Sequence, residues 1–347
     1  MTALRLVRLL LRAALLSLLL RHHSLQPVLC SEEDMETLWA RWKGDFGVSY
    51  SEKSNEEQRK YIWEENLEMI KVNNENFYTG SSSFLMAMNK YGALTRQEYR
   101  QLQGTMIDRW TMKPGKTVSA AKLRAAAKKK KSNDIDYRTL GYVTPVKDQG
   151  FCGSCWAFST TGAVEGQMYK TTGRLMPLSE QHLMDCSRSY GTYGCSGAWM
   201  ANAYDYVVNN GLPPENSYPY TAVDNQHCYY DSNMIVARIR DYRFIPAGDD
   251  EALANALVAI GPITVAVDAD HSSFLFYSSG IYDEPNCRPE NLNHAVLLVG
   301  YGREGKSDYW IIKNSWGTGW GEGGYMRMSR KRENACGISS YALYPVV

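Results

Sequence analysis

Long apolar runs are scarce in this sequence. Beyond residue 30, no stretch approaches the roughly 20 apolar residues of a membrane-spanning helix, so we expect no membrane partner. Excess charge is also missing, because 38 Lys and Arg stand against 37 Asp and Glu, a net charge of +1. This balance gives no reason to expect a nucleic-acid partner. The sequence has no internal repeat and no Asn-x-Ser/Thr site, so delivery through an N-linked sugar is not supported.

Metal-binding cysteine patterns are also lacking. The chain has eight cysteines, at positions 30, 152, 155, 186, 195, 228, 287 and 336. Cys152 and Cys155 form a C-x-x-C pair, which could be a redox disulfide, half a zinc site, or two thiols with unrelated roles. A redox motif should lie within a βαβ pattern, which is absent here, and a zinc site needs a second ligand pair, which is also absent. We therefore predict no metal site and no cofactor.

The first 30 residues are typical of a secretory signal peptide. Arg5 and Arg8 precede a short apolar run, residues 9–20, and a cleavage site is expected near Cys30. The alternative is a retained anchor. Cleavage after Cys30 would leave seven cysteines, so three disulfides in an oxidising compartment would leave one free thiol.

The rest of the chain divides by charge. Residues 1–131 carry 22 Lys and Arg and 14 Asp and Glu, a net +8, whereas residues 132–347 carry 16 and 23, a net −7. Opposite charges are expected if the first part docks on the second. Trp63, Leu67 and Ile70 recur at helical spacing in the first part. Residues 105–131 lose this pattern and end in four lysines, so we expect a solvated linker or a cleavable junction there.

The second part combines helical and strand-like patterns. Helices are predicted at residues 155–171, 178–186 and 199–210, and strands at residues 262–269, 294–302 and 309–316. Helices that precede strands indicate an α+β fold with two segregated subdomains and a cleft between them.

One cysteine, one histidine and two amides could form a catalytic group. Cys155 begins a predicted helix, where the helix dipole and free N–H groups favour a reactive thiolate. His294 lies 139 residues later at the start of an apolar strand, although any single histidine can equally be a core or surface residue. Asn314 could orient the His294 ring, and Trp316 could shield their hydrogen bond. The Gln149 amide could donate to an oxyanion.

These residues lie within motifs of a known family. The stretch from Cys152 to Trp156, CGSCW, is the local signature of papain and the cathepsins. With VTPVKDQG, GCSG, NHAV and KNSWGTGWGEGGY, residues 132–347 resemble papain-family cysteine proteases, above all the cathepsin L group (L, K and S types). The resemblance implies a papain-like two-subdomain fold, with Cys155 on a helical left subdomain and His294 and Asn314 on a β-barrel right subdomain.

The resemblance also implies the organisation of the whole chain. It predicts a signal peptide (1–30), an inhibitory helical propeptide (31–131) and a peptidase domain (132–347). The propeptide helix pattern is carried by Arg59, Trp63, Asn66, Ile70 and Asn74, although its usual leading glutamate is Asn55 here. A second propeptide motif reads Ala87, Asn89, Tyr91 and Ala93, and Ala93 replaces the family's aspartate. The implied disulfides are Cys152–Cys195, Cys186–Cys228 and Cys287–Cys336, which leave Cys155 free.

Substrate-binding residues follow from the same likeness. Gly197 and Ala198 would pair with an extended substrate, and the pocket for the P2 residue, two before the scissile bond, would be formed by Trp199, Met200, Ala266, Leu292 and Tyr341. With two large aromatics and no acid, the pocket should favour Leu, Val or Pro over Phe and accept Arg poorly. Alternatively, either aromatic only packs in the core.

The predicted function is that of a cysteine endopeptidase made as a secreted or lysosomal zymogen. An occluding loop of the carboxypeptidase type is absent from the sequence. The expected partners are protein and peptide substrates, its own propeptide as an intramolecular inhibitor, and cystatin-type inhibitors; the enzyme is expected to be a monomer. Alternatives are a catalytically silent binding protein on the same scaffold and a structural disulfide-rich protein.

Overall fold

In the first compact unit, the described residues contain one helix. The computed structural model describes residues 34–104, 115–128, 134–224 and 227–347, and the chain divides after Lys53 into two units. Helix α2 (Met35–Phe46) begins at Asp34, whose side chain caps it, and ends at Gly47, which has a left-handed φ of 63°. The predicted signal peptide and the lysines at 129–131 lie outside the described residues.

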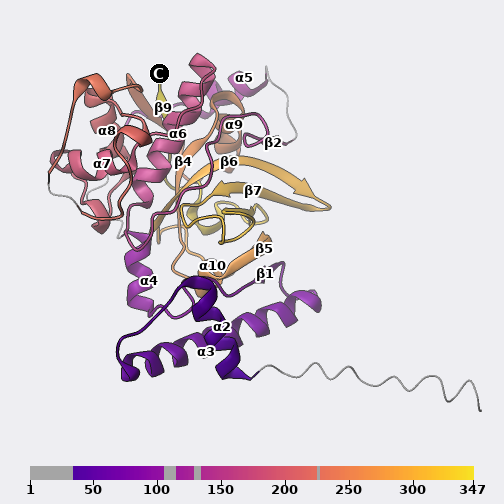
Figure 1. Cartoon of the computed structure of the whole chain (residues 1–347). Helices are drawn as coiled ribbons and strands as arrows, with labels where there is room; N and C mark the ends of the chain where they lie inside the picture. Colours follow the sequence, from indigo (N-terminus) through magenta and orange to yellow (C-terminus); the bar gives the residue numbers. More distant parts are fainter. Residues whose placement is uncertain (1–33, 105–114, 129–133, 225–226) are drawn as a thin grey trace, which may run out of the picture. The chain divides into compact units, whose positions relative to one another are not determined.

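The second unit combines helices with one sheet (Figure 1). Its α-helices are α3 (Lys53–Tyr78), α4 (Arg96–Gln103), α5 (Ala120–Lys128), α6 (Cys155–Thr172), α7 (Glu180–Cys186), α8 (Met200–Asn210), α9 (Asp250–Ile260) and α10 (Ser272–Leu275). Its strands are β1 (Phe84–Met86), β2 (Ile135–Asp136), β3 (Asp241–Phe244), β4 (Ile263–Val267), β5 (Tyr277–Tyr282), β6 (His294–Glu304), β7 (Ser307–Lys313), β8 (Tyr325–Ser329) and β9 (Ala342–Val346). Short 3₁₀ turns lie at Arg188–Tyr190, Gly194–Ser196, Glu215–Ser217, Ser232–Met234 and Ala335–Gly337.

The sheet is mixed and open. Its strand order is β1-β5-β8-β7-β6-β4-β9-β3, with β2 paired to β6. The β5–β8 pair is parallel, and the other pairs are antiparallel. The α+β class is confirmed, but the predicted barrel is not closed: the short end strands β1 and β3 each pair with one neighbour and not with each other.

Helix α6 packs directly on the sheet, and small residues make this possible. A Cβ on Gly162 would meet the Leu297 side chain of β6 at 2.8 Å, and one on Gly166 would meet Pro262 at 3.0 Å. The Ser159 hydroxyl donates to the carbonyl of Val296 in β6 at 2.7 Å. This close approach fixes the start of α6 beside the start of β6. The predicted helices at 155–171, 178–186 and 199–210 are confirmed as α6, α7 and α8.

Part of the predicted linker is folded, which corrects the expectation for residues 120–128. Helix α5 packs against α9, and its Leu123 and Ala127 are buried. Thr117 pairs with Phe244 at the edge of the sheet. The amphipathic helix predicted around Trp63 and Ile70 is confirmed as α3, which buries both side chains.

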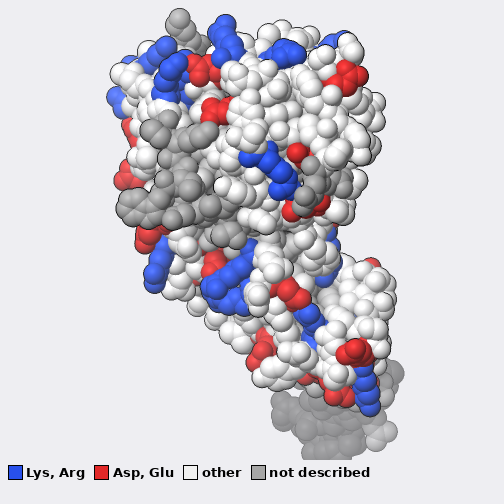
Figure 2. Space-filling view, turned by 90° about the vertical axis from the view of Figure 1, so that its left-hand side faces the viewer, with Lys and Arg blue, Asp and Glu red and all other residues white. Residues whose placement is uncertain are grey.

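Surface charge is mixed in sign. On the face shown in Figure 2, acidic and basic side chains are interspersed and do not gather into one large field of either sign. Within the described ranges, the helices are all too short or too polar to cross a bilayer.

Candidate active site

Three disulfides leave one thiol among the described cysteines. Cys152 is joined to Cys195, Cys186 to Cys228, and Cys287 to Cys336, which confirms the predicted pairing. Cys155 is free and buried at the first position of α6. The Cys152–Cys195 bond anchors the loop immediately before this helix. The C-x-x-C pair is therefore a pair by spacing only.

His294 and Asn314 meet because their strands are antiparallel neighbours. His294 begins β6 and Asn314 follows the last residue of β7, so both lie at the same end of the β6–β7 pair. The His294 Nε2 lies 2.8 Å from the Asn314 Oδ1, which requires a proton on Nε2. The Trp316 ring lies 4.8 Å from the His294 ring and covers this hydrogen bond. The Nδ1 atom of His294 is buried without a hydrogen-bond partner among the described residues.

Gln149 is fully buried beside this group. Its Oε1 accepts from the hydroxyl of Ser315, which fixes the orientation of the amide. Its Nε2 donates to the carbonyls of Cys152 and Leu102, each at 2.7 Å. The amide therefore donates both to its own loop, at Cys152, and to a peptide carbonyl from the N-terminal part of the chain, at Leu102.

The C-terminal end of α4 occupies the site. The S–H of Cys155 donates to the carbonyl of Gln103 at 2.9 Å, next to the Leu102 carbonyl held by Gln149. A Cβ on Gly104 would meet the Gly153 carbonyl oxygen at 2.4 Å, and the φ of Gly104 is +64°. Only glycine fits this contact. Sequence reasoning missed the residues at 102–104, although a Gly that follows a helical pattern was a usable signal.

Burial keeps the thiol and the imidazole uncharged in this state. Burial raises the pKa of Cys155 to about 12, although the N–H groups of Ala295, Trp156 and Cys155 itself oppose this shift. The expectation of a lowered pKa is therefore wrong for the occupied site, because desolvation outweighs the helix terminus. Burial also lowers the pKa of His294 to about 4, despite opposing contributions from Asn314 and the nearby Gln103 carbonyl. A thiolate–imidazolium pair is thus disfavoured while α4 fills the site.

The predicted P2-pocket residues lie in the same buried region as Cys155. Trp199, Met200, Ala266 and Tyr341 belong to one buried cluster with Cys155, and Leu292 packs against it. The rings of Trp199 and Tyr341 lie 4.7 Å apart. The hydroxyl of Tyr341 accepts from the backbone N–H of Ala201 at 3.3 Å. Gly197 has a φ of 105°, and Ala198 is buried beside it.

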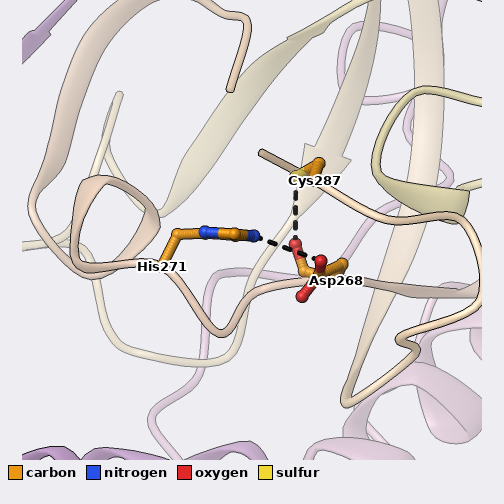
Figure 3. A group of neighbouring side chains, drawn as sticks. All are labelled: Asp268, His271 and Cys287. Carbon is orange, nitrogen blue, oxygen red and sulfur yellow. Dashed lines mark hydrogen bonds and ion pairs between the residues drawn. The ribbon is translucent and has the colours of Figure 1, made fainter. Parts of the chain in front are cut away.

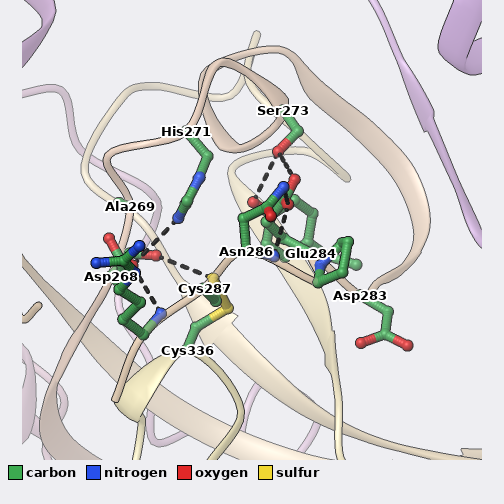
Figure 4. The surroundings of a disulfide bond; sticks show 12 residues. Asp268, Ala269, His271, Ser273, Asp283, Glu284, Asn286, Cys287 and Cys336 are labelled. Carbon is green, nitrogen blue, oxygen red and sulfur yellow. Dashed lines mark hydrogen bonds and ion pairs between the residues drawn. A yellow bond between two sulfur atoms is a disulfide. The ribbon is translucent and has the colours of Figure 1, made fainter. Parts of the chain in front are cut away.

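A second polar group, Asp268 with His271 and Cys287, is structural in character (Figures 3 and 4). The sulfur of Cys287 is bonded to Cys336 and cannot serve as a thiolate ligand. The Asp268 carboxylate accepts from the His271 ring, from the backbone N–H of Arg288 and from the side-chain amide of Asn293. Because the carboxylate oxygens of Asp268 already accept these hydrogen bonds, they are not available as metal ligands.

Comparison with known proteins decides the family. The model of the papain family cysteine proteases matches residues 131–346. The chain belongs to the papain family of cysteine proteases. The cathepsin propeptide inhibitor domain (I29) matches residues 39–99, so this papain-family protease is made as a zymogen with its own inhibitory propeptide.

Several relatives of this papain-family protease cover nearly all of the chain. It is 46% identical over 314 residues to digestive cysteine proteinase 2 of Homarus americanus, covering 89% of this chain and 94% of the relative. It is 45% identical over 322 residues to cathepsin L2 of Homo sapiens, covering 91% and 94%. The solved structure of digestive procathepsin L2 from the larval midgut of Tenebrio molitor aligns with a TM-score of 0.85 and 38% identity, covering 90% of this chain and all of that one. The predicted family and papain-like fold are confirmed.

Proposed function

We propose that this protease cleaves internal peptide bonds with Cys155 as nucleophile, His294 as base and then acid, Asn314 as the residue that orients His294, and Gln149 as an oxyanion donor. His294 takes the thiol proton through Nδ1, and the thiolate attacks the substrate carbonyl to form a thioester as the amine leaves with the proton. Water activated by His294 then hydrolyses the thioester. Gln149 Nε2 and the Cys155 N–H stabilise the oxyanion in both steps.

One observation carries this proposal. A peptide backbone lies on the proposed catalytic group, with one carbonyl accepting from Gln149 Nε2 and the next accepting from the Cys155 thiol. The Leu102 carbonyl is held by the amide that would hold a substrate oxyanion, and the next residue of the same backbone touches the proposed nucleophile.

The test is active-site titration after acid activation. A thiol-directed epoxide should form a one-to-one adduct on Cys155 and abolish peptide hydrolysis, and Cys155→Ala should give neither adduct nor hydrolysis. A correctly processed wild-type protein that hydrolyses no peptide and is not labelled would instead identify a silent binding protein on this scaffold.

We further propose the processing and destination of the chain. Residues 1–30 are removed as a signal peptide and residues 31–131 as the propeptide, which leaves a monomeric peptidase of residues 132–347 in a lysosomal or secreted location, open to cystatin-type inhibitors. The charge difference between the two parts supports a propeptide that docks and then leaves. N-terminal sequencing and the mass of the secreted and acid-treated protein test these boundaries.

A small or branched aliphatic P2 residue is the proposed substrate preference. Trp199 and Tyr341 are 3% and 2% exposed and pack on each other, and Phe244 supports Tyr341 from behind at 5.4 Å. These contacts favour a shallow pocket. In a peptide series varied at P2, Leu, Val or Pro should exceed Phe and Arg, and Tyr341→Ala should raise the Phe-to-Leu ratio of kcat/KM about tenfold. A wild-type preference for Phe or Arg would contradict the proposal.

A further inference from the structure

Helix α4 of the propeptide presents two arginines to one carboxylate. Arg96 Nη2 lies 3.3 Å from Asp270, and Arg100 reaches the same carboxylate through Nε and Nη2, the latter at 3.0 Å. The arginine side chains are 66% and 58% exposed, whereas that of Asp270 is only 16% exposed. The propeptide therefore covers Asp270, and its removal would leave this acid without the two cations.

Asp270 lies on a loop that one propeptide residue, Gln103, joins to the reaction centre. The preceding carbonyl, that of Ala269, accepts from Gln103 Nε2 at 2.9 Å and from the Tyr99 hydroxyl. Gln103 also contacts Cys155 through its own carbonyl. A single residue thus connects the loop that carries Asp270 with the nucleophile.

Hydrogen bonds to Asp268 and Asn293 hold the loop around Asp270 in place. Asp268 accepts from the backbone N–H of Arg288 at 2.9 Å and from the Asn293 amide at 2.9 Å. It also accepts from the His271 ring at 3.1 Å (Figures 3 and 4). The Asn293 side chain also accepts from the N–H of Ala269 at 2.8 Å. The loop that contains Asp270 is therefore held by hydrogen bonds between residues outside the propeptide.

A second acid, Asp148, also pairs with a cation of the propeptide. It forms an ion pair with Lys90, whose ammonium also lies over the Tyr91 ring. Asp148 makes a backbone bridge with Trp316, and the Tyr91 and Tyr99 rings pack edge-on against Trp316 at 5.7 and 6.1 Å. Asp148 and Trp316 are therefore backbone neighbours, and α4, the helix that reaches Asp270, packs on the Trp316 ring through Tyr99.

Trp316 marks the side of the site that receives the leaving group. It packs on His294, which would protonate the departing amine. The predicted acyl-side residues, among them Ala198, Trp199 and Tyr341, belong instead to the other buried cluster, with Cys155. Asp148 and Asp270 thus flank the leaving-group side.

We infer that Asp270 and Asp148 form a subsite for Lys or Arg side chains within the first three residues on the leaving-group side of the scissile bond, an inference that rests on the proposed function. The occupants seen in the structure are a lysine and two arginines of the propeptide. The side-chain chemistry of these occupants transfers to substrates, whereas the order of residues along the propeptide does not. Partly covered carboxylates favour such cations over neutral side chains.

The test uses quenched peptides with a constant acyl side and one varied leaving-group position. Arg is compared with citrulline and Lys with norleucine at each of the first three positions, using acid-activated enzyme whose concentration is set by thiol titration. The kcat/KM for the basic peptide should exceed that of its neutral partner about fivefold at one or more positions. The ratio should fall as salt is raised, because exposed charges are screened.

Variants assign the effect to the two acids. Asp270→Asn and Asp148→Asn should each lower the basic-to-neutral ratio, and together they should bring it close to one. Glu251→Gln is the matched control, because Glu251 also pairs with a propeptide arginine, Arg124, but lies on α9. This control should keep the wild-type ratio.

Two results would overturn the inference: a basic-to-neutral ratio of one in titrated, active wild-type enzyme, or a basic preference that survives in the double variant. Failure of the proposed function would give a different result. A protein whose Cys155 does not react in the active-site titration would hydrolyse neither the basic nor the neutral peptide.

Discussion

At the scale of single residues, Gln149 has a role both in the site blocked by the propeptide and in the site proposed for catalysis. Its amide now donates to the Leu102 carbonyl, and its orientation is fixed by Ser315 whether or not the propeptide is present. The N–H group that helps hold the inhibitor is therefore already aimed where an oxyanion would form.

Gln149→Ala is expected to lower kcat by about 10²- to 10³-fold, the usual cost of losing one oxyanion donor. KM should change much less, because the lost contact strengthens mainly in the transition state. Steady-state kinetics on titrated mature enzyme checks this. A loss confined to KM would show that Gln149 serves ground-state binding.

His271 should make the loop at 268–271 most stable in acid. The hydrogen bond to Asp268 raises the pKa of His271, opposed by burial and supported by the charges of Asp268, Glu284 and Asp270. This contribution is full below the ordinary histidine pKa of about 6.5 and is lost as pH rises through the higher folded value. Although burial opposes it, bonding to His271 and its other donors lowers the pKa of Asp268, so its charge persists well into acid.

His271→Gln should therefore lower the Tm of the mature enzyme by about 2–4 °C more at pH 5 than at pH 8, which corresponds to about 1 kcal/mol. Thermal unfolding at both pH values measures this difference. His227→Gln, at an exposed position, is the control and should show no such dependence. Equal losses for His271→Gln at both pH values would contradict the ion pair.

Some site residues carry local signals and others do not. Motif and pattern predict Cys155 at a helix start, His294 at a strand start and Asn314 at a strand end. The structure places the Nε2 of His294 2.8 Å from the Oδ1 of Asn314. Gln103 and Asp270 could not be predicted in this way. The contact of Gln103 with Cys155 depends on how α4 docks, and the role of Asp270 is indicated only by the arginines that this helix brings to it. Sequence spacing encodes neither.

At the scale of elements, α3 and α4 are joined by one ion pair. Arg59 of α3 reaches both carboxylate oxygens of Glu98 in α4, at 2.5 and 2.7 Å, and also the Ala93 carbonyl at 3.0 Å. Glu98 completes a capping box with Thr95 at the start of α4. The helix that blocks the site is thus attached to the long propeptide helix by a residue that also caps it.

Glu98→Gln should destabilise the zymogen by about 1 kcal/mol, from a weakened cap and a lost, partly exposed ion pair. Hydrogen bonds from Arg59 lower the pKa of Glu98 to about 2. Its contribution is therefore present above the ordinary value of about 4.3 and is lost only as pH falls through about 2.

The loss caused by Glu98→Gln should therefore be the same at pH 5 and pH 7 in denaturant unfolding of the zymogen. Glu68→Gln on the exposed side of α3 is the control. A loss that vanishes by pH 5 would mean that Glu98 itself is the acid-sensitive contact.

Local periodicity explains which elements could be predicted. Helix α8 and strands β4, β6 and β7 have clear apolar patterns and were expected close to their observed bounds. Helix α5 was missed, because its alanines and lysines give no wide apolar face and only Leu123 and Ala127 are buried, against α9. The addition of β1 to β5, almost 200 residues away, depends on long-range pairing that no local pattern shows.

At the scale of the whole molecule, the zymogen is silent for an electrostatic as well as a steric reason. Because burial raises the pKa of Cys155 to about 12, the thiol stays protonated at pH 7. Removal of the propeptide restores water to the site and takes away the dominant cause of this shift.

Alkylation of Cys155 by iodoacetamide at pH 7 should therefore be at least about 100-fold slower in the zymogen than in the mature enzyme. Gly104→Ala should speed labelling of the zymogen, because the added Cβ would meet the Gly153 carbonyl oxygen at 2.4 Å and loosen the blocking segment. Mass spectrometry of timed samples gives both rates. Equal rates in zymogen and mature enzyme would exclude suppression of the thiolate.

Strand β1 of the propeptide covers one edge of the sheet. It lies antiparallel to β5 at the end of the sheet, and the Ser83 hydroxyl donates to the Ile281 carbonyl at 2.6 Å. When the propeptide leaves, β5 becomes an uncovered edge with free N–H and C=O groups, which invite pairing with another chain. Activation therefore uncovers an edge strand that the zymogen keeps paired with its own propeptide.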